Sequence, residues 1–161
     1  MSAEISVAAG FPPPKPDGRE VCACFMARRL GRRITQLYER HLAPFGLGIG
    51  QFSLLGMALA MPDSGISALA EALDIDRTTL SRNLQGLIRA GLVEMQSGQD
   101  RRQRMVRATP AGRMLWRQAL NGWRAAQDEA RRLLPDFDIL LSDMEKAGDA
   151  LPEPAALGAA G

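Results

Sequence analysis

The side chains best suited to bind a ligand are grouped on one predicted helix over residues 77–90. Leu80, Leu84, Leu87 and Ile88 recur on one side at helical spacing, which predicts that this side packs on a core. The remaining sides carry donors and acceptors long enough to reach base edges or phosphates in a groove of DNA. These side chains are Arg77, Thr78, Thr79, Ser81, Arg82, Asn83, Gln85 and Arg89.

Each type of side chain on this helix predicts a particular contact. The guanidinium of Arg82 can donate two hydrogen bonds to guanine O6 and N7, and the amide of Asn83 or Gln85 can pair with adenine N6 and N7. Hydroxyl groups near the helix start suit phosphate, aided by the positive end of the helix dipole. A helix with a merely solvated polar face would show the same pattern, so the helix alone does not decide between the two interpretations.

A basic loop follows the helix, between two predicted strands at 92–95 and 105–108. Asp100 and Arg102 are two residues apart and therefore project to the same side of an extended segment, where the carboxylate can orient the guanidinium. An arginine held in this way can enter the minor groove, where narrow A·T-rich DNA concentrates negative potential. The other arginines of the loop are Arg101 and Arg104. In an isolated loop a solvated charge run would be the better interpretation, but here both ends are held by strands.

The charge distribution agrees with a nucleic-acid surface in this region. Residues 76–113 contain eight Arg and three acids, a net charge of +5, whereas the whole chain carries only +2. The rest of the chain therefore sums to −3. Positive charge is concentrated on the segment that would face DNA.

The elements around this segment predict a helix-turn-helix. A short helix is expected over 66–73 with Ser67 as its cap, a tight connection follows, and Asp76 can cap the helix that begins at Arg77. Gly91 ends that helix. Together with the two strands and their basic loop, the pattern predicts a winged helix-turn-helix.

The flanking segments are predicted to be helical. We expect helices over about 18–43 and 50–61, a turn at 62–65, a long helix that opens at Thr109-Pro110 and breaks at Pro135, and a last helix over 137–150. Residues 1–17 are Pro-rich and are expected to be a disordered arm, and residues 152–161 a flexible tail. The fold class is therefore mainly α with a small β-hairpin wing.

Composition excludes several classes of function. The chain of 161 residues has 46% hydrophobic and 24% charged residues, as expected of a soluble globular protein. It has no apolar run of about 20 residues and no secretory signal, so we expect a cytoplasmic protein without membrane contact. A single histidine, His41, excludes a His-rich metal cluster, and no nucleotide-binding or hydrolase motif appears. We therefore expect no enzyme, metal or cofactor; the alternative to a DNA reader is a winged-helix interaction module that does not bind DNA.

The chain resembles the MarR family of transcription regulators. The resemblance is carried by 66–70, 76–84, Gly91-Leu92-Val93, Asp100-Arg101-Arg102 and 108–112, and it extends from Cys24 to about Ala150. It implies a homodimeric repressor that binds a pseudo-palindromic operator in double-stranded DNA. It also implies one domain over 18–151, with a dimer lobe at 18–48 and 112–151 and a DNA-binding lobe at 49–111. The interface residues it implies are Phe25, Leu30, Ile34, Leu133, Leu134, Phe137, Leu140 and Leu141; an intramolecular core is their other interpretation.

Two kinds of release signal remain open. The segment 24–38 is similar to that of organic-hydroperoxide sensors of the family, which implies a reactive Cys24, a Tyr38 that hydrogen-bonds it, and Arg28 where those sensors have a second tyrosine. Cys22 is a possible disulfide partner, although a bridge across two residues is strained. Otherwise Cys24 is a small buried apolar residue. The second signal is a small aromatic or anionic effector in a pocket between the lobes, lined by Phe25, Arg28, Arg32, Phe52 and Trp116.

Overall fold

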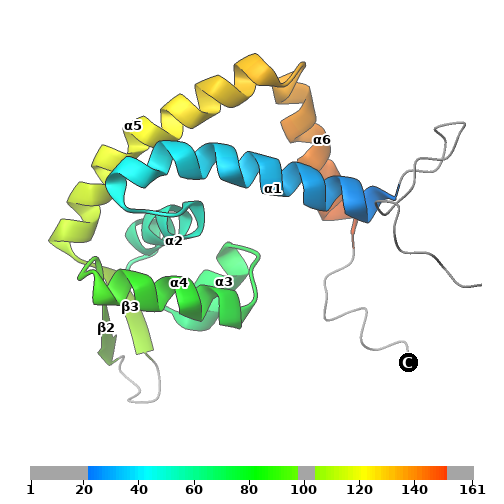
Figure 1. Ribbon diagram of the computed structural model, residues 1–161. Coiled ribbons are helices and arrows are strands. Elements are labelled where there is room, and N and C mark those ends of the chain that lie inside the picture. The colour runs from blue at the N-terminus through cyan, green and yellow to red at the C-terminus, as the bar shows by residue number, and fades with distance from the viewer. Residues whose placement is uncertain (1–21, 98–103, 152–161) are drawn as a thin grey trace, which may run out of the picture.

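The computed structural model describes residues 22–97 and 104–151, which form a helical protein with one small sheet (Figure 1). Two long helices lie side by side and a smaller lobe of short helices and strands lies beneath them. The elements are α1 (Ala23–Leu42), the 3-10 turn η1 (Ala43–Phe45), α2 (Ile49–Ala60), β1 (Ser64–Gly65), α3 (Ile66–Ala72), α4 (Arg77–Arg89), β2 (Val93–Ser97), β3 (Arg104–Ala108), α5 (Pro110–Leu133) and α6 (Phe137–Ala150). The predicted mainly α fold with a winged helix-turn-helix is confirmed.

The sheet has three antiparallel strands in the order β1-β3-β2. β2 and β3 form the predicted hairpin, in a register that pairs Val93 with Ala108 and Glu94 with Arg107. The short strand β1 adds Ser64 opposite Val106. The prediction that 62–65 is only a turn was wrong in this respect, because a strand of two residues is too short to show alternation of polar and apolar residues.

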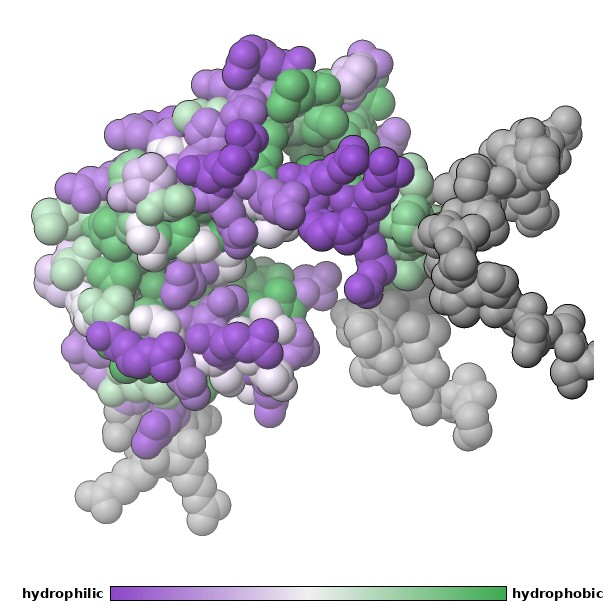
Figure 2. All heavy atoms as spheres, in the orientation of Figure 1, coloured by the Kyte–Doolittle hydropathy of each residue, from purple (hydrophilic) through white to green (hydrophobic). Residues whose placement is uncertain are grey.

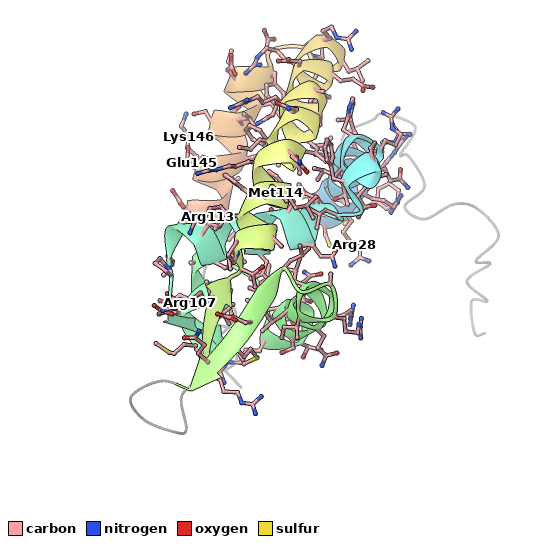
Figure 3. All side chains as sticks on the ribbon, turned by 90° about the vertical axis from the view of Figure 1, so that its left-hand side faces the viewer. Arg28, Arg107, Arg113, Met114, Glu145 and Lys146 are labelled. Carbon is pink, nitrogen blue, oxygen red and sulfur yellow. The ribbon has the colours of Figure 1, made fainter. Side chains whose placement is uncertain are left out.

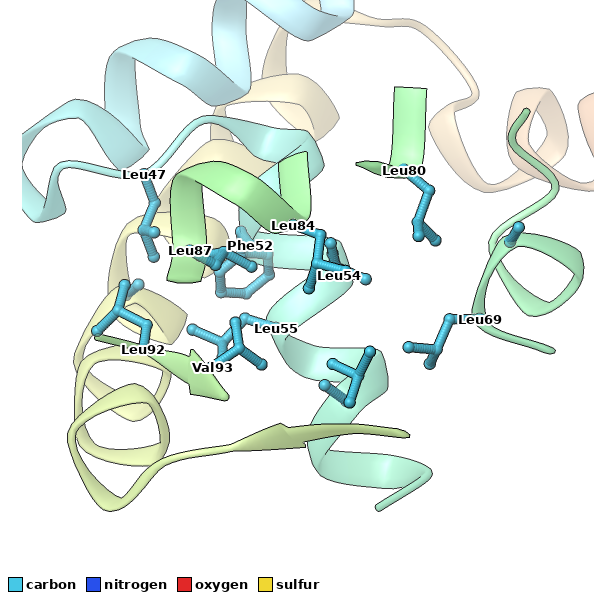
Figure 4. Close-up of a cluster of buried hydrophobic side chains, with 14 of the residues drawn as sticks. Leu47, Phe52, Leu54, Leu55, Leu69, Leu80, Leu84, Leu87, Leu92 and Val93 are labelled. Atoms are coloured by element: carbon cyan, nitrogen blue, oxygen red, sulfur yellow. The ribbon is translucent and has the colours of Figure 1, made fainter. Parts of the chain in front are cut away.

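Leucine is the commonest residue in the core of the lower lobe, where it packs with Phe52, Val93 and Val106 (Figure 4). Leu54 and Leu55 of α2 are fully buried, and they lie among Leu80 of α4, Leu69 of α3 and Val106 of β3. α2 is apolar on most sides because it is the central element of this lobe, as its composition predicted. Burial of this kind fixes the direction of α4 relative to the sheet.

α1 and α5 pack along each other in the upper part of the molecule (Figure 1). The Tyr38 hydroxyl donates to Gln127 Oε1 at 2.6 Å, and burial raises the pKa of Tyr38 although Arg131 opposes this. Glu129 Oε2 lies 2.6 Å from His41 Nε2 and Glu129 Oε1 accepts from Arg40 at 3.1 Å. These hydrogen bonds, that of His41 first, hold the pKa of Glu129 below its ordinary value.

The structure corrects two details of the predicted helices. Ser67 is not the cap of α3, because α3 begins at Ile66 with Gly65 as its N-cap, and Ser67 is the second residue of the helix. Ile88 is 37% exposed and does not share the buried side of α4, whereas its neighbour Leu87 is fully buried. The helix predicted from near Gly18 begins only at Ala23, because Cys22 is extended and is the N-cap of α1. The predicted arm over 1–17 and the tail over 152–161 lie outside the described residues.

Within residues 22–97 and 104–151, no single helix is long and apolar enough to cross a membrane. The segments Ala23–Phe45 and Ile49–Ala60 pass that test only as a pair, bent by 71° at the break between them.

Candidate nucleic-acid interface

α4 begins where the side chain of Asp76 replaces the missing hydrogen-bond partners of its first turn. Asp76 Oδ1 accepts from the Thr79 backbone N–H at 2.9 Å, and Asp76 Oδ2 accepts from Thr79 Oγ1 at 2.6 Å. The two Thr79 groups, its hydroxyl first, hold the pKa of Asp76 below the ordinary value. The predicted N-cap is therefore confirmed. Leu80, Leu84 and Leu87 are buried beneath the helix, so its outer side is presented on a fixed axis.

The outer side of α4 carries four exposed polar side chains in one row. Thr78, Arg82, Gln85 and Arg89 are all exposed. They are spaced by three or four residues and therefore lie on one face of the helix. Ser81 lies beside the row and is partly covered. This face has the width and the hydrogen-bonding groups that readout of a major groove needs.

Three other predicted contact residues of α4 are engaged within the protein. The Thr79 hydroxyl is bonded to Asp76 as described, and Arg77 Nη2 donates to Ser67 Oγ at 2.8 Å, which ties α4 to α3. The Asn83 amide lies against α2, so that a Cβ placed on Gly50 would stand 2.8 Å from Asn83 Nδ2. Asn83 thus packs between two helices, a placement that helical spacing could not reveal because it depends on the close approach of α2.

The wing follows α4 and its strands end near the basic loop. Arg104 is exposed and is the first residue of β3, so it lies at the end of a strand and not within the loop. Asp100, Arg101 and Arg102 lie outside the described residues. Of the four charged residues predicted to contact DNA from the wing, the structure therefore describes only Arg104, at the start of β3.

The base of the wing is held by an ion pair that the sequence analysis missed. Arg107 of β3 donates from Nε to Asp63 Oδ1 at 2.8 Å and from Nη2 to Asp63 Oδ2 at 2.5 Å. These bonds lower the pKa of Asp63 and raise that of Arg107. Asp63 has a φ of +60°, so the turn before β1 presents its carboxylate in an unusual backbone conformation. No sequence signal joins two residues so far apart.

The residues predicted for a thiol switch lie at two places on α1. Cys22 is the N-cap of α1 and Cys24 is in its first turn, and both are exposed in the protomer. Cys24 is therefore not the small buried residue of the other interpretation. Tyr38 lies about four turns further along the same helix, and its hydroxyl is bonded to Gln127. Within one protomer Tyr38 does not reach Cys24.

The residues predicted for an effector pocket divide into an aromatic cluster and an exposed cationic row. Phe52 is buried and stacks on Trp116 with ring centroids 5.7 Å apart. Trp116 Nε1 is buried without a hydrogen-bond acceptor in the part of the chain that the structure describes. Arg28 and Arg32 are exposed one turn apart on α1, and Phe25 is half-buried. In the same described part, no group of three His, Cys, Asp or Glu side chains is placed to hold a metal ion.

The geometry defines a winged helix-turn-helix protein, and comparison with known proteins gives its family. The sequence profile of the MarR family matches residues 45–103. The structure of the transcriptional regulator MosR of M. tuberculosis in complex with DNA is 36% identical, with a TM-score of 0.73, and covers 81% of this chain and 96% of its own. The chain belongs to the MarR family of transcription regulators.

Two further solved structures have the same fold. The repressor CouR of Rhodococcus jostii RHA1, bound to a 23-mer DNA duplex, is 25% identical with a TM-score of 0.72 and covers 79% of this chain and 92% of its own. The PcaV regulator of Streptomyces coelicolor, in complex with its natural ligand, is 21% identical with a TM-score of 0.71. It covers 80% of this chain and 92% of its own. A comparison with curated protein sequences found no match.

Proposed function

We propose that this protein is a cytoplasmic, homodimeric repressor that binds a pseudo-palindromic operator and is not an enzyme. The observation that carries the proposal is the exposed row of Thr78, Arg82, Gln85 and Arg89 on a helix fixed by three buried leucines. MosR, at 36% identity, and CouR were both solved with DNA, which supports the same partner here.

The residues of α4 and the wing divide into base readers and backbone contacts. Arg82 and Gln85 have the length and geometry to reach guanine and adenine edges, and Thr78 and Ser81 are close enough to the start of α4 to meet phosphate. Arg77 and Thr79 position the helix through Ser67 and Asp76, and Asn83 positions it against α2. The wing residues assigned to the backbone or the minor groove are Asp100, Arg101, Arg102 and Arg104.

The dimer is supported by an apolar patch that the protomer leaves uncovered. Leu133 at the end of α5 is 61% exposed, and on α6 Ile139 is 62%, Leu141 43% and Met144 46% exposed. Figure 2 shows this apolar surface where α5 meets α6. A two-fold dimer formed there places two copies of α4 in successive major grooves, about 34–36 Å apart.

We assign the release signal to the thiols or to an effector cleft between the lobes beside Trp116, the two signals that the sequence indicated. Cys22 and Cys24 are exposed at the start of α1, with Arg28 one turn further on, so an oxidant in solution can reach both thiols. For the effector, the exposed Arg28 and Arg32 of α1 are the groups that would meet its anionic part. Either signal acts only if it binds or modifies the DNA-free state preferentially.

A salt titration of DNA binding tests the function. Fluorescence anisotropy with the intergenic DNA beside the gene should give a complex whose affinity falls steeply as salt rises, because phosphate contacts release counterions. Arg82→Ala should weaken operator binding by about 1–3 kcal/mol and relax sequence preference. Arg124→Ala, an exposed arginine of α5, is the matched control and should change neither. No retained complex at any salt would favour the interaction module instead.

The thiol switch has a separate test. Cumene hydroperoxide should release the wild-type protein from DNA, and Cys24→Ser should bind DNA normally but resist release. A panel of aromatic acids tests the cleft in the same assay. If peroxide leaves wild-type binding unchanged, the thiols carry no signal.

A further inference from the structure

A groove distinct from the outer side of α4 and from the cleft proposed beside Trp116 runs along the outer flank of the molecule. It encloses about 840 Å³ between the outer face of the wing and the first turns of α5. Figure 3 looks onto this flank and places Arg107 on the sheet below Arg113 and Met114 on α5. The residues that matter for its chemistry are Glu94, Arg107, Arg113, Met114, Arg117 and Gln118. A volume of this size lies within the range of small-molecule sites.

The sheet wall of the groove carries a net negative charge. Arg107 is directly opposite Glu94 in the register of β2 and β3, and its guanidinium makes two hydrogen bonds to Asp63. One cation is therefore matched by two carboxylates. This wall offers little attraction to an anion.

The helix wall carries positive charge without compensation from its neighbours. Arg113 and Arg117 are exposed, lie one turn apart on the same face of α5, and make no ion pair among residues 22–97 and 104–151. Arg113 follows the first turn of α5, a helix of 24 residues, and Arg117 lies one turn further on. Two guanidinium groups so placed can grip one carboxylate between them.

An apolar surface lies beside these cations. Met114 is 61% exposed on the same face of α5, and its thioether is a soft and adaptable contact for a flat apolar group. The Gln118 amide, one turn further on, adds a hydrogen-bonding group. The helix wall of the groove therefore presents two cations and an apolar side chain within about one turn of α5, close enough for one small molecule to contact them together.

We propose that this groove binds an organic anion, with its carboxylate held by Arg113 and Arg117 and its apolar body against Met114. A bare inorganic anion would use the arginines and leave Met114 uncovered. The groove is lined by the wing and by α5, and the side chains that would hold the ligand all come from α5. It is independent of DNA binding, and free protein suffices to test it.

Isothermal titration of the full chain with 1-naphthoate, without DNA, tests the proposal. We expect one ligand per chain, binding of inorganic phosphate at least about tenfold weaker, and a similar loss for the neutral analogue 1-naphthalenemethanol. Arg117→Ala should weaken naphthoate binding by about ten- to a hundredfold, since it removes a charge-assisted hydrogen bond. Met114→Ser should weaken naphthoate but leave phosphate unchanged.

Arg124→Ala is the matched control because it removes an exposed arginine about two turns further along the same face of α5, outside the groove. It should bind naphthoate as the wild type does, and circular dichroism should show that each variant is folded. The proposal is overturned if naphthoate gives no binding heat up to millimolar concentration, or if Arg117→Ala binds normally. Loss of binding in Arg28→Ala/Arg32→Ala alone would place the ligand in the other cleft and overturn it equally.

Discussion

Asp76 decides where α4 begins and how firmly its first turn is held. Its carboxylate accepts from both the backbone and the hydroxyl of Thr79, and these bonds depress its pKa below the ordinary 3.8. A depressed pKa means that the folded state prefers the charged form. The stabilisation from Asp76 is therefore present above pH about 4 and is lost as pH falls through the lower folded-state value.

Two substitutions separate the cap from its charge. Asp76→Ala should lower Tm by roughly 2–4 °C and weaken operator binding, because the first turn of α4 frays. Asp76→Asn retains a capping side chain and should keep most of the stability at pH 7, while the loss of stability on acidification becomes shallower. Thermal melts of the three proteins between pH 3 and 7 measure both effects. Equal slopes in acid for wild type and Asp76→Asn would contradict the role of the charge.

The residues that sequence could place are those whose partners are close in the chain. Asp76 and Thr109 cap the helices that follow them, and each accepts from an N–H group three residues on. Asn83 and Asp63 were beyond reach, because their contacts with Gly50 and Arg107 exist only after α2 and the sheet have packed. The helical periodicity of the apolar residues assigned Asn83 to the polar side of α4, but it could not show that α2 approaches that side.

Among the elements, α5 depends on two glycines at which another segment approaches closely. A Cβ on Gly122 would stand 2.5 Å from the His41 carbonyl oxygen of α1, and one on Gly112 would stand 2.1 Å from the Leu92 carbonyl oxygen. Both obstacles are backbone atoms, which cannot move aside as a side-chain end can. The sequence predicted α5 and its start at Thr109-Pro110. It gave no sign that Gly112 and Gly122 are sites of close approach, because the approaching segments are distant in the chain.

Gly122→Ala should therefore push α1 away from α5 and destabilise the protein by several kcal/mol, as overpacking does at its upper end. Gly31→Ala in α1 is the control, because nothing lies within 4 Å of the added Cβ, and it should keep stability or raise it by up to about 1 kcal/mol. The unfolding midpoints in urea of the wild type, Gly122→Ala and Gly31→Ala measure these changes in stability. If Gly122→Ala unfolds at the same midpoint as the wild type, the close approach of α1 and α5 is not required.

At the scale of the whole molecule, two features stand out. Residues 76–113 contain the excess positive charge, and the end of α5 and the first half of α6 carry the exposed side chains Leu133, Ile139, Leu141 and Met144, where Figure 2 shows an apolar surface. The sequence anticipated both features, since the charge excess and the apolar positions were read from it. The sequence could not decide which of these apolar residues belong to the core of the protomer and which to an interface. Phe137 is buried within the protomer, where Arg131 lies over its ring at 5.3 Å, whereas Leu133 and Leu141 are exposed.

Leu133→Glu/Ile139→Glu should convert the dimer to a monomer, because two charges would be buried without partners in an apolar interface. Operator affinity should then fall by at least about a hundredfold, since each half-site is bound alone. Met114→Glu is the matched control: Met114 is exposed to 61%, as Leu133 is, but lies at the other end of α5. Analytical ultracentrifugation should show a dimer for wild type and Met114→Glu and a folded monomer for the double variant. If the double variant remains dimeric, the interface lies elsewhere. If the wild-type protein sediments as a monomer yet binds the full operator tightly, the two-fold arrangement is wrong.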